Sequence, residues 1–143
     1  MKGLKLYTVS YNEFKDRYGA LYHTVFDEED TGQVPSHVYI GFLDGEYVGF
    51  FSAYIHNIDC IYMQYGGFID KFKGVMSLGI FKQTVNYIHE EFDGIIFRAK
   101  NTNIKVIKLA LSAGFKIIGV RHDKDLYVEM LKTKGDKQNG QAV

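Results

Sequence analysis

The chain has 143 residues, of which 46% are hydrophobic and 15% aromatic, which suits one domain with a buried core and excludes a disordered chain. Its 17 basic and 17 acidic residues cancel, so the bulk charge argues against nucleic acid or an anionic membrane as a partner. Cys60 is the only cysteine, which excludes an intramolecular disulfide and favours a reducing, cytoplasmic setting. We expect neither a signal peptide nor a membrane span, because no apolar run is long enough.

The first third of the chain predicts a strand, a helix and a loop. Alternation over Leu4 to Val9 is typical of a strand. Ser10 stands three residues before Glu13, which is a capping-box pattern and predicts the start of a helix over roughly Tyr11 to Phe26. The acidic segment from Asp27 to Ser36 contains the only proline and predicts a loop.

Three β-rich runs follow this loop. His37 to Leu43 and Glu46 to His56 are joined by Asp44-Gly45, which predicts a tight hairpin because both central positions need a positive φ angle. The third run, Ile58 to Ile69, contains Gly66-Gly67. Glycines inside a strand predict a bulge or a close approach of another group to the backbone.

After Ile69 the spacing of the hydrophobic residues alternates between a helical and a strand pattern. A helical stripe runs from Leu78 to Phe92. Asn103 and Gly114 are placed to begin and end a second helix, the first as N-cap and the second as left-handed stop. Apolar runs around and after these helices predict three further strands: Ile95–Phe97, Phe115–Val120 and Asp125–Leu131.

These elements give the order β-α-β-β-β-α-β-α-β-β. Such an order predicts an α/β fold with a mixed sheet, covered by helices on its faces. We expect residues 1–132 to form a single domain. The polar segment 133–143, rich in Gly, Gln and Lys, is expected to be a flexible C-terminal tail.

The segment from Asn103 to Phe115 connects this order to a known family. It has an Asn, branched and small apolar residues, a Leu and a closing Gly-Phe, and it resembles the late motif of the GNAT superfamily of acetyl-CoA-dependent N-acetyltransferases. The resemblance extends over about Leu4 to Leu131. It implies a GNAT-like acyl-CoA N-acyltransferase fold, acetyl-CoA or another acyl-CoA as cosubstrate, and an amine-bearing small molecule or protein as acceptor.

The resemblance also implies where the cosubstrate lies. The fourth strand, Ile58 to Ile69, is expected to diverge from the fifth so that the pantetheine arm enters the gap. The loop Lys73 to Leu78 is expected to hold the pyrophosphate with backbone N–H groups at a helix N-terminus, which attracts phosphate. Lys73 and Gly74 suit this pattern, whereas Met76 and Leu78 replace small residues of the family. The implied cofactor-binding residues are Phe68, Ile69, Lys73, Gly74, Val75, Met76, Ser77, Leu78 and Asn103.

No catalytic residue is assigned from the sequence. The family often carries a Tyr acid just after the Leu of its late motif, and Ala110 occupies that position here. The polar residues on or beside the central strands are His56, Tyr62, Gln64 and Tyr65. His56 could serve as a base near neutral pH, although a His at a strand end is more often only a surface residue. No motif for a metal site is present.

Three functions therefore stay open. The first is an N-acetyltransferase, in which the acidic run Asp27 to Asp30 could attract an amine, although such a run is more often only solvated. The second is a catalytically inactive GNAT-fold protein with a structural or binding role, which Met76, Leu78 and Ala110 favour; small proteins of tailed bacteriophages look similar. The third is an unrelated α/β binding module, such as a profilin-like or cystatin-like sheet, against which the late helix argues. A homodimer is also left open.

Overall fold

The structure is a computed structural model that describes residues 3–22, 35–74 and 76–135. In these residues the elements follow the order expected from the sequence. The strands are β1 (Leu4–Val9), β2 (His37–Leu43), β3 (Glu46–Asn57), β4 (Cys60–Phe68), β5 (Gly94–Lys100), β6 (Lys116–Asp123) and β7 (Asp125–Thr133). The helices are α1 (Tyr11–Tyr22), α2 (Ser77–His89), α3 (Ile104–Ser112) and the short 3-10 turn η1 (Asp70–Phe72).

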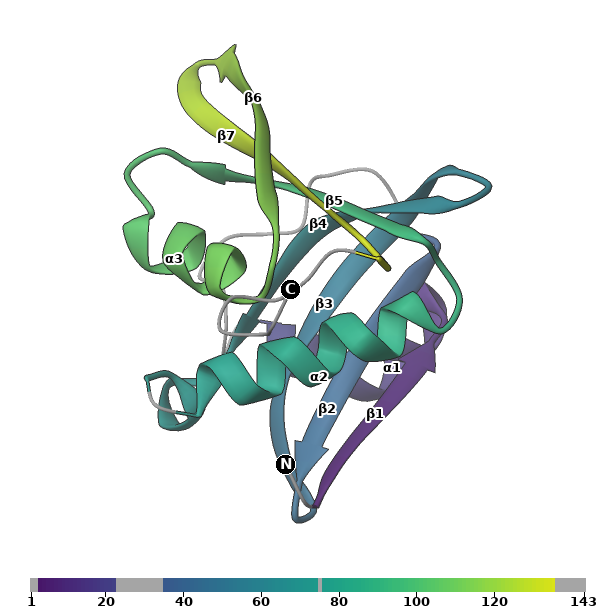
Figure 1. The fold of residues 1–143 in the computed structure, drawn as a ribbon. Helices are drawn as coiled ribbons and strands as arrows, with labels where there is room; N and C mark the ends of the chain where they lie inside the picture. Colours follow the sequence, from purple (N-terminus) through teal and green to yellow (C-terminus); the bar gives the residue numbers. More distant parts are fainter. Residues whose placement is uncertain (1–2, 23–34, 75, 136–143) are drawn as a thin grey trace.

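The strands form one mixed sheet in the order β1-β2-β3-β4-β5-β7-β6 (Figure 1). Among the described strands only β4 and β5 pair in parallel, and every other neighbouring pair is antiparallel. A parallel pair needs a crossover connection, which α2 supplies. The expected mixed α/β sheet is therefore confirmed.

Helices cover both faces of the sheet. Alternate residues of β2 point to opposite faces: Tyr39 belongs to the main core beneath α2 and α3, whereas Val38 and Ile40 pack with Phe14 of α1. Figure 1 shows α2 crossing one face of the sheet, with α1 on the other side. The middle of the main core consists of side chains that are completely buried, among them Ile61, Val85, Ile95 and Met130. Each contributes about 1.5–3 kcal/mol by leaving water.

Local sequence signals produce the expected turns. Asp44 and Gly45 have φ angles of 50° and 83°, and Leu43 pairs directly with Glu46, so the predicted two-residue hairpin is confirmed. The Oδ1 atom of Asn103 accepts a hydrogen bond from the backbone N–H of Val106 at 3.4 Å, as a helix N-cap does.

The end of α3 is equally well defined. Gly114 has a φ angle of 100°, its N–H donates to the carbonyl of Leu111 at 3.1 Å, and the N–H of Phe115 donates to the carbonyl of Ala110 at 3.0 Å. These two bonds form a Schellman motif, which satisfies carbonyls at the helix end. The predicted stop at Gly114 is confirmed, and the chain enters β6 directly after it.

Several boundaries differ from the sequence-based ones. The strand expected from Ile58 begins at Cys60, because the Oδ1 atom of Asn57 accepts from the N–H of Asp59 at 3.0 Å and forms a turn. The strand expected over Ile95–Phe97 extends to Lys100 because it pairs with β7 along its whole length. The acidic run Asp27 to Asp30 lies outside the described residues. No helix in the described ranges is long and apolar enough to cross a membrane.

His89 brings a titratable group into the core at the end of α2. Its side chain is 5% exposed, and its Nδ1 atom lies 3.0 Å from the carbonyl oxygen of Phe92. Because a carbonyl only accepts, Nδ1 carries the hydrogen, and the buried Nε2 atom has no hydrogen-bond partner among the described residues. Burial lowers the pKa of His89, and nearby Lys132 acts in the same direction, while the Phe92 carbonyl partly opposes it.

The lowered pKa predicts a pH-dependent stability. Below about pH 6.5 the unfolded chain binds a proton at His89 that the folded chain does not, so the free energy of unfolding falls as the pH falls, by at most about 1.4 kcal/mol per pH unit. Urea unfolding at pH values from about 7.5 down to about 5, on both sides of the ordinary His pKa of about 6.5, measures this slope. His89→Gln should flatten the slope. His122→Gln, at an exposed position, should leave it intact, and equal slopes for His89→Gln and the parent would contradict the assignment.

Candidate functional site

The two central strands separate after a short parallel ladder. Residues Cys60 to Met63 of β4 pair with Gly94 to Phe97 of β5, and the pairing stops there. Beyond that point β4 continues to Phe68 along β3 only, and β5 continues to Lys100 along β7 only. The expected divergence of the fourth and fifth strands is therefore present. It leaves a wedge-shaped gap in the ladder, flanked by backbone groups without a strand partner among the described residues.

A β-bulge lies where the strands part. Ser52 of β3 pairs with Tyr65, but the next residue, Ala53, pairs with Met63, so Gln64 is an extra residue on β4. A bulge of this kind bends its strand and increases the local twist. The bend therefore directs the second half of β4 away from β5.

Gly66 lets the bent half of β4 lie close against β3. A Cβ atom at Gly66 would be 1.8 Å from Cδ1 of the Phe51 ring, which is far inside van der Waals contact. Phe51 in turn packs edge-on against Phe68 and Phe81, with ring centroids 5.9 Å apart in both pairs. Of the two alternatives predicted from the glycines, the close approach is found at Gly66, while the bulge lies two residues earlier, at Gln64.

The turn that follows β4 is anchored to the β2–β3 hairpin. The N–H of Ile69 donates to the carbonyl of Val48 at 2.8 Å. Lys71 Nζ lies 2.8 and 2.7 Å from the two carboxylate oxygens of Glu46. Both partners are exposed, so this ion pair adds at most about 1 kcal/mol. It joins the turn to the hairpin in addition to the Ile69–Val48 hydrogen bond.

Gly74 and Ser77 shape the start of α2. Gly74 has a φ angle of 91°, in the region that favours glycine. Both the N–H and the hydroxyl of Ser77 donate to the Gly74 carbonyl, at 3.1 and 2.7 Å. No side chain caps the helix at its N-cap residue, Met76. Past Ser77, the start of α2 therefore presents first-turn N–H groups and the positive end of the helix dipole, and no described side chain caps it.

The structure separates the expected cofactor-binding residues into buried and exposed ones. Phe68 is 8% exposed and belongs to the core, so its side chain is committed to packing. Lys73 and Gly74 are exposed, and Met76 is 37% exposed rather than folded into the core. Ile69, Ser77 and Leu78 are partly buried around the turn, Asn103 is exposed at the start of α3, and Val75 lies outside the described residues.

Ala110 is completely buried in the core under α3. Its neighbour at the helix end, Phe115, packs against Phe81 and Phe97, with ring centroids 5.8 and 5.1 Å apart. A methyl group carries no exchangeable proton, so nothing at this position can act as an acid.

Of the four polar candidates from the sequence, the side chains of Gln64 and Tyr65 lie outside the described part of the structure, and those of His56 and Tyr62 lie on different strands. His56 is exposed near the far end of β3. Tyr62 is the best placed, two residues before the bulge, where its ring stacks on Tyr54 at 5.2 Å. Burial raises the pKa of Tyr62, and Arg98 partly opposes this. Its phenol is therefore neutral near pH 7 and can donate a hydrogen bond but not act as a base.

A set of ion pairs on β5, β6 and β7 borders the gap and was not recognised from the sequence. The Arg98 guanidinium lies 4.4 Å from the centroid of the Tyr127 ring and 3.7 Å from Asp123. Lys100 lies 3.5 Å from Asp125. The sequence shows charged residues alternating along these strands, but only the register of β5 with β7 shows which charged side chains come together.

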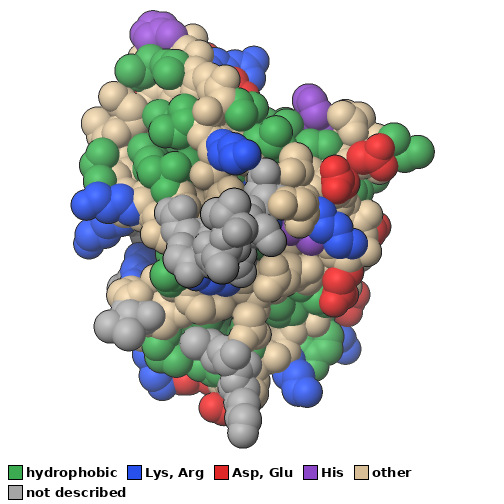
Figure 2. All heavy atoms as spheres, viewed as in Figure 1, with side chains coloured by type: hydrophobic (Ala, Val, Ile, Leu, Met, Phe, Trp, Pro, Cys, Tyr) green, Lys and Arg blue, Asp and Glu red, His purple; other side chains and the backbone are tan. Residues whose placement is uncertain are grey.

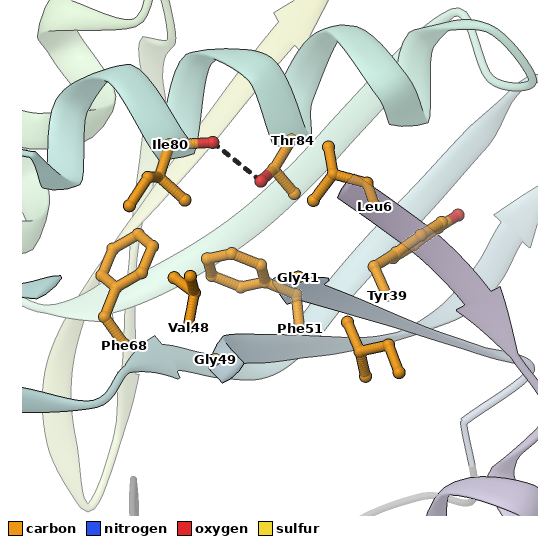
Figure 3. A pocket seen from close by; sticks show the side chains of 10 residues that line it. Leu6, Tyr39, Gly41, Val48, Gly49, Phe51, Phe68, Ile80 and Thr84 are labelled. Carbon is orange, nitrogen blue, oxygen red and sulfur yellow. Dashed lines mark hydrogen bonds between the residues drawn. The ribbon is translucent and has the colours of Figure 1, made fainter. Parts of the chain in front are cut away.

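Two cavities are formed by the described residues, and neither is lined by Met63 or Phe97, where the β4–β5 ladder ends. Figure 3 shows a void between α2 and β1–β4, lined by residues such as Leu6, Val48 and Phe51. Its volume of about 10 Å³ suits one water molecule at most. An open hollow of about 560 Å³ lies between β1 and α1, three strands away from β4 in the sheet. Among the described residues no cluster of three potential metal ligands is found.

Solved structures of acetyltransferases have a similar fold. No protein-family model matches the chain, and no curated protein matches its sequence. The IAA acetyltransferase from Bacillus cereus ATCC 14579 superposes with a TM-score of 0.72 at 10% identity, covering 91% of this chain and 99% of its own. The ribosomal-protein-S18-alanine N-acetyltransferase from Escherichia coli gives 0.71 at 9% identity, covering 98% and 99%.

A third match was solved with ligands. The aminoglycoside acetyltransferase AAC(6')-Ib, in complex with coenzyme A and kanamycin, gives a TM-score of 0.65 at 15% identity, covering 92% of this chain and 95% of its own. With the parting of β4 and β5 and the uncapped α2, these matches show that the chain has the GNAT acetyltransferase fold. They also rule out the profilin-like and cystatin-like sheets considered from the sequence.

The contact between Gly66 and Phe51 predicts a strong effect of one methyl group. Gly66→Ala should destabilise the protein by about 1–3 kcal/mol, because the Phe51 ring and its aromatic neighbours must move. Gly119→Ala is the matched control, since a Cβ atom there meets nothing within 4 Å. Thermal unfolding measures both variants, and an equal loss for the two would show that the close packing at Gly66 is not the cause.

Proposed function

We propose that the chain is an N-acetyltransferase that transfers an acetyl group from acetyl-CoA to an amine. The observation that carries this proposal is the early end of the β4–β5 ladder at Met63 and Phe97. A sheet that loses a parallel ladder in its middle gives up backbone hydrogen bonds. Such a gap is expected where another molecule supplies the missing partners.

The residues around the gap fit a nucleotide thioester. The start of α2 has no side-chain cap, and N–H groups at such a helix start bind phosphate oxygens. Gly74 keeps the backbone bare of side-chain atoms there, and no described atom lies within 4 Å of where its Cβ would be. Lys73, an exposed residue on the same turn, adds a positive charge there. A pantetheine arm can then extend along the unpaired edge of β4.

The chain's own groups define what chemistry is available. Acetyl-CoA supplies the activated acyl group when it is bound, and the protein has to orient the amine and handle its proton. The neutral phenol of Tyr62 can donate a hydrogen bond, and Arg98 with its acidic neighbours can orient polar groups at the start of the gap. With no carboxylate on β4, the proton of the amine passes to solvent. Catalysis would then depend mostly on positioning.

A second candidate function is a GNAT-fold protein without catalysis, kept for a structural or binding role, as in a bacteriophage particle. The specific observation that favours it is the complete burial of Ala110 at the family's usual acid position. The protruding Met76 beside the phosphate-binding turn points the same way. This candidate predicts that ligands bind weakly or not at all and that no amine is acetylated.

Binding of acetyl-CoA distinguishes the two candidates. We expect acetyl-CoA to raise the thermal midpoint of the full chain and to give a calorimetric binding signal. Gly74→Ala should weaken that binding about tenfold or more, because a side chain is strained at the positive φ angle of Gly74 and the backbone of the turn must change. Gly45→Ala is the matched control. Gly45 has a similar φ angle of 83° and open space around its Cβ position, but it lies in the β2–β3 turn.

The comparison of Gly74→Ala with Gly45→Ala separates the effect of backbone strain on stability from the effect of the turn on acetyl-CoA binding. If both glycine variants lose stability equally and only Gly74→Ala loses acetyl-CoA binding, the turn before α2 holds the phosphates. Acetylation is then measured as release of free coenzyme A with a panel of aminoglycosides, polyamines and peptide N-termini. Binding without turnover on any amine would favour the second candidate, and the absence of binding at millimolar acetyl-CoA would contradict the first.

A further inference from the structure

Two half-buried side chains of opposite charge lie beside the end of the β4–β5 ladder. Arg98 directly follows Phe97, where the ladder stops, and Glu129 is the residue of β7 that pairs with Arg98. Directly paired residues point to the same face of a sheet. This is the face opposite to the main core, because the neighbouring residues Phe97 and Met130 belong to that core. The side chains of Arg98 and Glu129 are 33% and 26% exposed.

Aromatic rings lie around this pair of charges. The ring of Tyr62 stacks on that of Tyr54 at 5.2 Å, and the Arg98 guanidinium lies 4.4 Å from the centroid of the Tyr127 ring. A guanidinium that lies against a ring keeps its N–H groups free to donate at its edge. Burial raises the pKa of Tyr62, while Arg98 lowers it and Glu129 raises it. Both charges are therefore within electrostatic reach of the same phenol.

The ion pairs that these two residues make are long. Arg98 Nη1 lies 3.7 Å from Asp123 Oδ2, and Arg121 Nη1 lies 3.9 Å from Glu129 Oε1. Both distances exceed the range of about 2.7–3.2 Å for an N–H···O hydrogen bond. The outer partners Asp123 and Arg121 are mostly exposed, so water weakens both pairs. The inner charges therefore keep hydrogen-bonding capacity that a ligand can use.

The two faces of the sheet differ in this region. On the core face of the β6–β7 hairpin, Ile117 and Val120 are exposed apolar side chains. Figure 2 shows hydrophobic side chains gathered where Figure 1 places β6, β7 and α3. The opposite face carries the Arg98–Glu129 pair. The helix on that face, α1, packs against β2 and β3 through Phe14, and Figure 1 shows it clear of β6 and β7.

We propose, as an extension that rests on the proposed acetyltransferase function, that the acceptor is a zwitterion, an amine that also carries a carboxylate, as a free amino acid does. Arg98 binds the carboxylate, and Glu129 receives the ammonium group. A guanidinium can hold a carboxylate through two parallel N–H···O bonds, which gives direction as well as attraction. The two charges then lie side by side in the ligand, as Arg98 and Glu129 do in the sheet.

The balance of charge explains the specificity. A polyamine or an aminoglycoside brings several ammonium groups toward Arg98 and Arg121, and these like charges oppose binding. A carboxylate without an amine meets the carboxylate of Glu129. A ligand with both charges neutralises both half-buried groups. The stacked rings of Tyr54 and Tyr62 offer an apolar surface for the rest of the molecule.

The test compares matched probes on the full chain. L-phenylalanine, L-leucine and L-glutamine are each compared with the amine that lacks the carboxylate and with the acid that lacks the amine. Coenzyme A is present, because it fills the cosubstrate site without an acetyl group to transfer. Calorimetric titration should show at least one amino acid that binds about tenfold or more tightly than both of its fragments. Equal binding of amino acid and amine in all three sets, or no binding of any amino acid, would overturn the proposal.

Substitutions assign the two charges. Arg98→Gln should weaken the amino acid about tenfold and leave its amine unchanged, whereas Glu129→Gln should weaken both the amino acid and the amine but not the acid. Arg17→Gln and Glu13→Gln are the matched controls, since these residues form an exposed ion pair on α1 at 3.2 Å. Losses as large in the control variants would count against the site.

A milder variant keeps the test valid if Arg98→Gln fails to fold. Arg98→Lys retains the positive charge but not the two parallel N–H groups. It should therefore keep only part of the preference for the amino acid over its amine. An unchanged preference in Arg98→Lys, together with an unchanged preference in Glu129→Gln, would show that the pair does not bind the ligand.

Turnover is measured separately, as release of coenzyme A from acetyl-CoA. Selective binding of an amino acid without turnover would contradict the proposed acetyltransferase and still support the binding roles of Arg98 and Glu129. Acetylation of polyamines or of the carboxylate-free amines as efficiently as of amino acids would support the acetyltransferase and overturn the zwitterion as its acceptor.

Discussion

The structure depends on one local interruption, the bulge at Gln64 together with the bare backbone of Gly66. Before the bulge, β4 holds the sheet together by pairing with β3 and β5 at once. After it, β4 follows β3 alone, and the aromatic ring of Phe51 fills the space above Gly66. A straight, fully paired β4 would bury its hydrogen-bonding groups in the sheet. The bent strand leaves them beyond the end of the β4–β5 ladder, without a strand partner among the described residues.

The backbone hydrogen bonds lost where β4 and β5 part are compensated by stabilising contacts on both sides of the gap. The paired half of β4 and β5 lies over completely buried residues such as Ile61 and Ile95, so the ladder is short but well supported. Past the gap, the Ile69–Val48 hydrogen bond and the Glu46–Lys71 pair hold the turn to the β2–β3 hairpin. The opening is therefore a fixed feature between two anchored segments. A site on anchored elements is better positioned for binding than one on a free loop.

How far the sequence could predict this structure depends on the range of each interaction. Asp44-Gly45, Asn103 and Gly114 act through bonds to residues at most five positions away, so their turns and caps were predictable. The glycines of β4 indicated a bulge or close approach without revealing that Phe51 was the partner. The charged pairs of Arg98 with Asp123 and of Lys100 with Asp125 depend on the register between strands 25 residues apart, which no local pattern contains.

The backbone geometry of the proposed site could be predicted more readily than its chemistry, for a related reason. A phosphate-binding turn is mostly backbone, and Gly74 at the start of a helix indicates that geometry by itself. Acid–base chemistry needs particular side chains brought together from separate strands, and the fold brings a neutral phenol, Tyr62, and a methyl group, Ala110, to the relevant places. Backbone geometry can hold a thioester without those groups. The same sheet can therefore keep a binding site intact while its catalytic side chains change, so binding and turnover have to be judged separately in this chain.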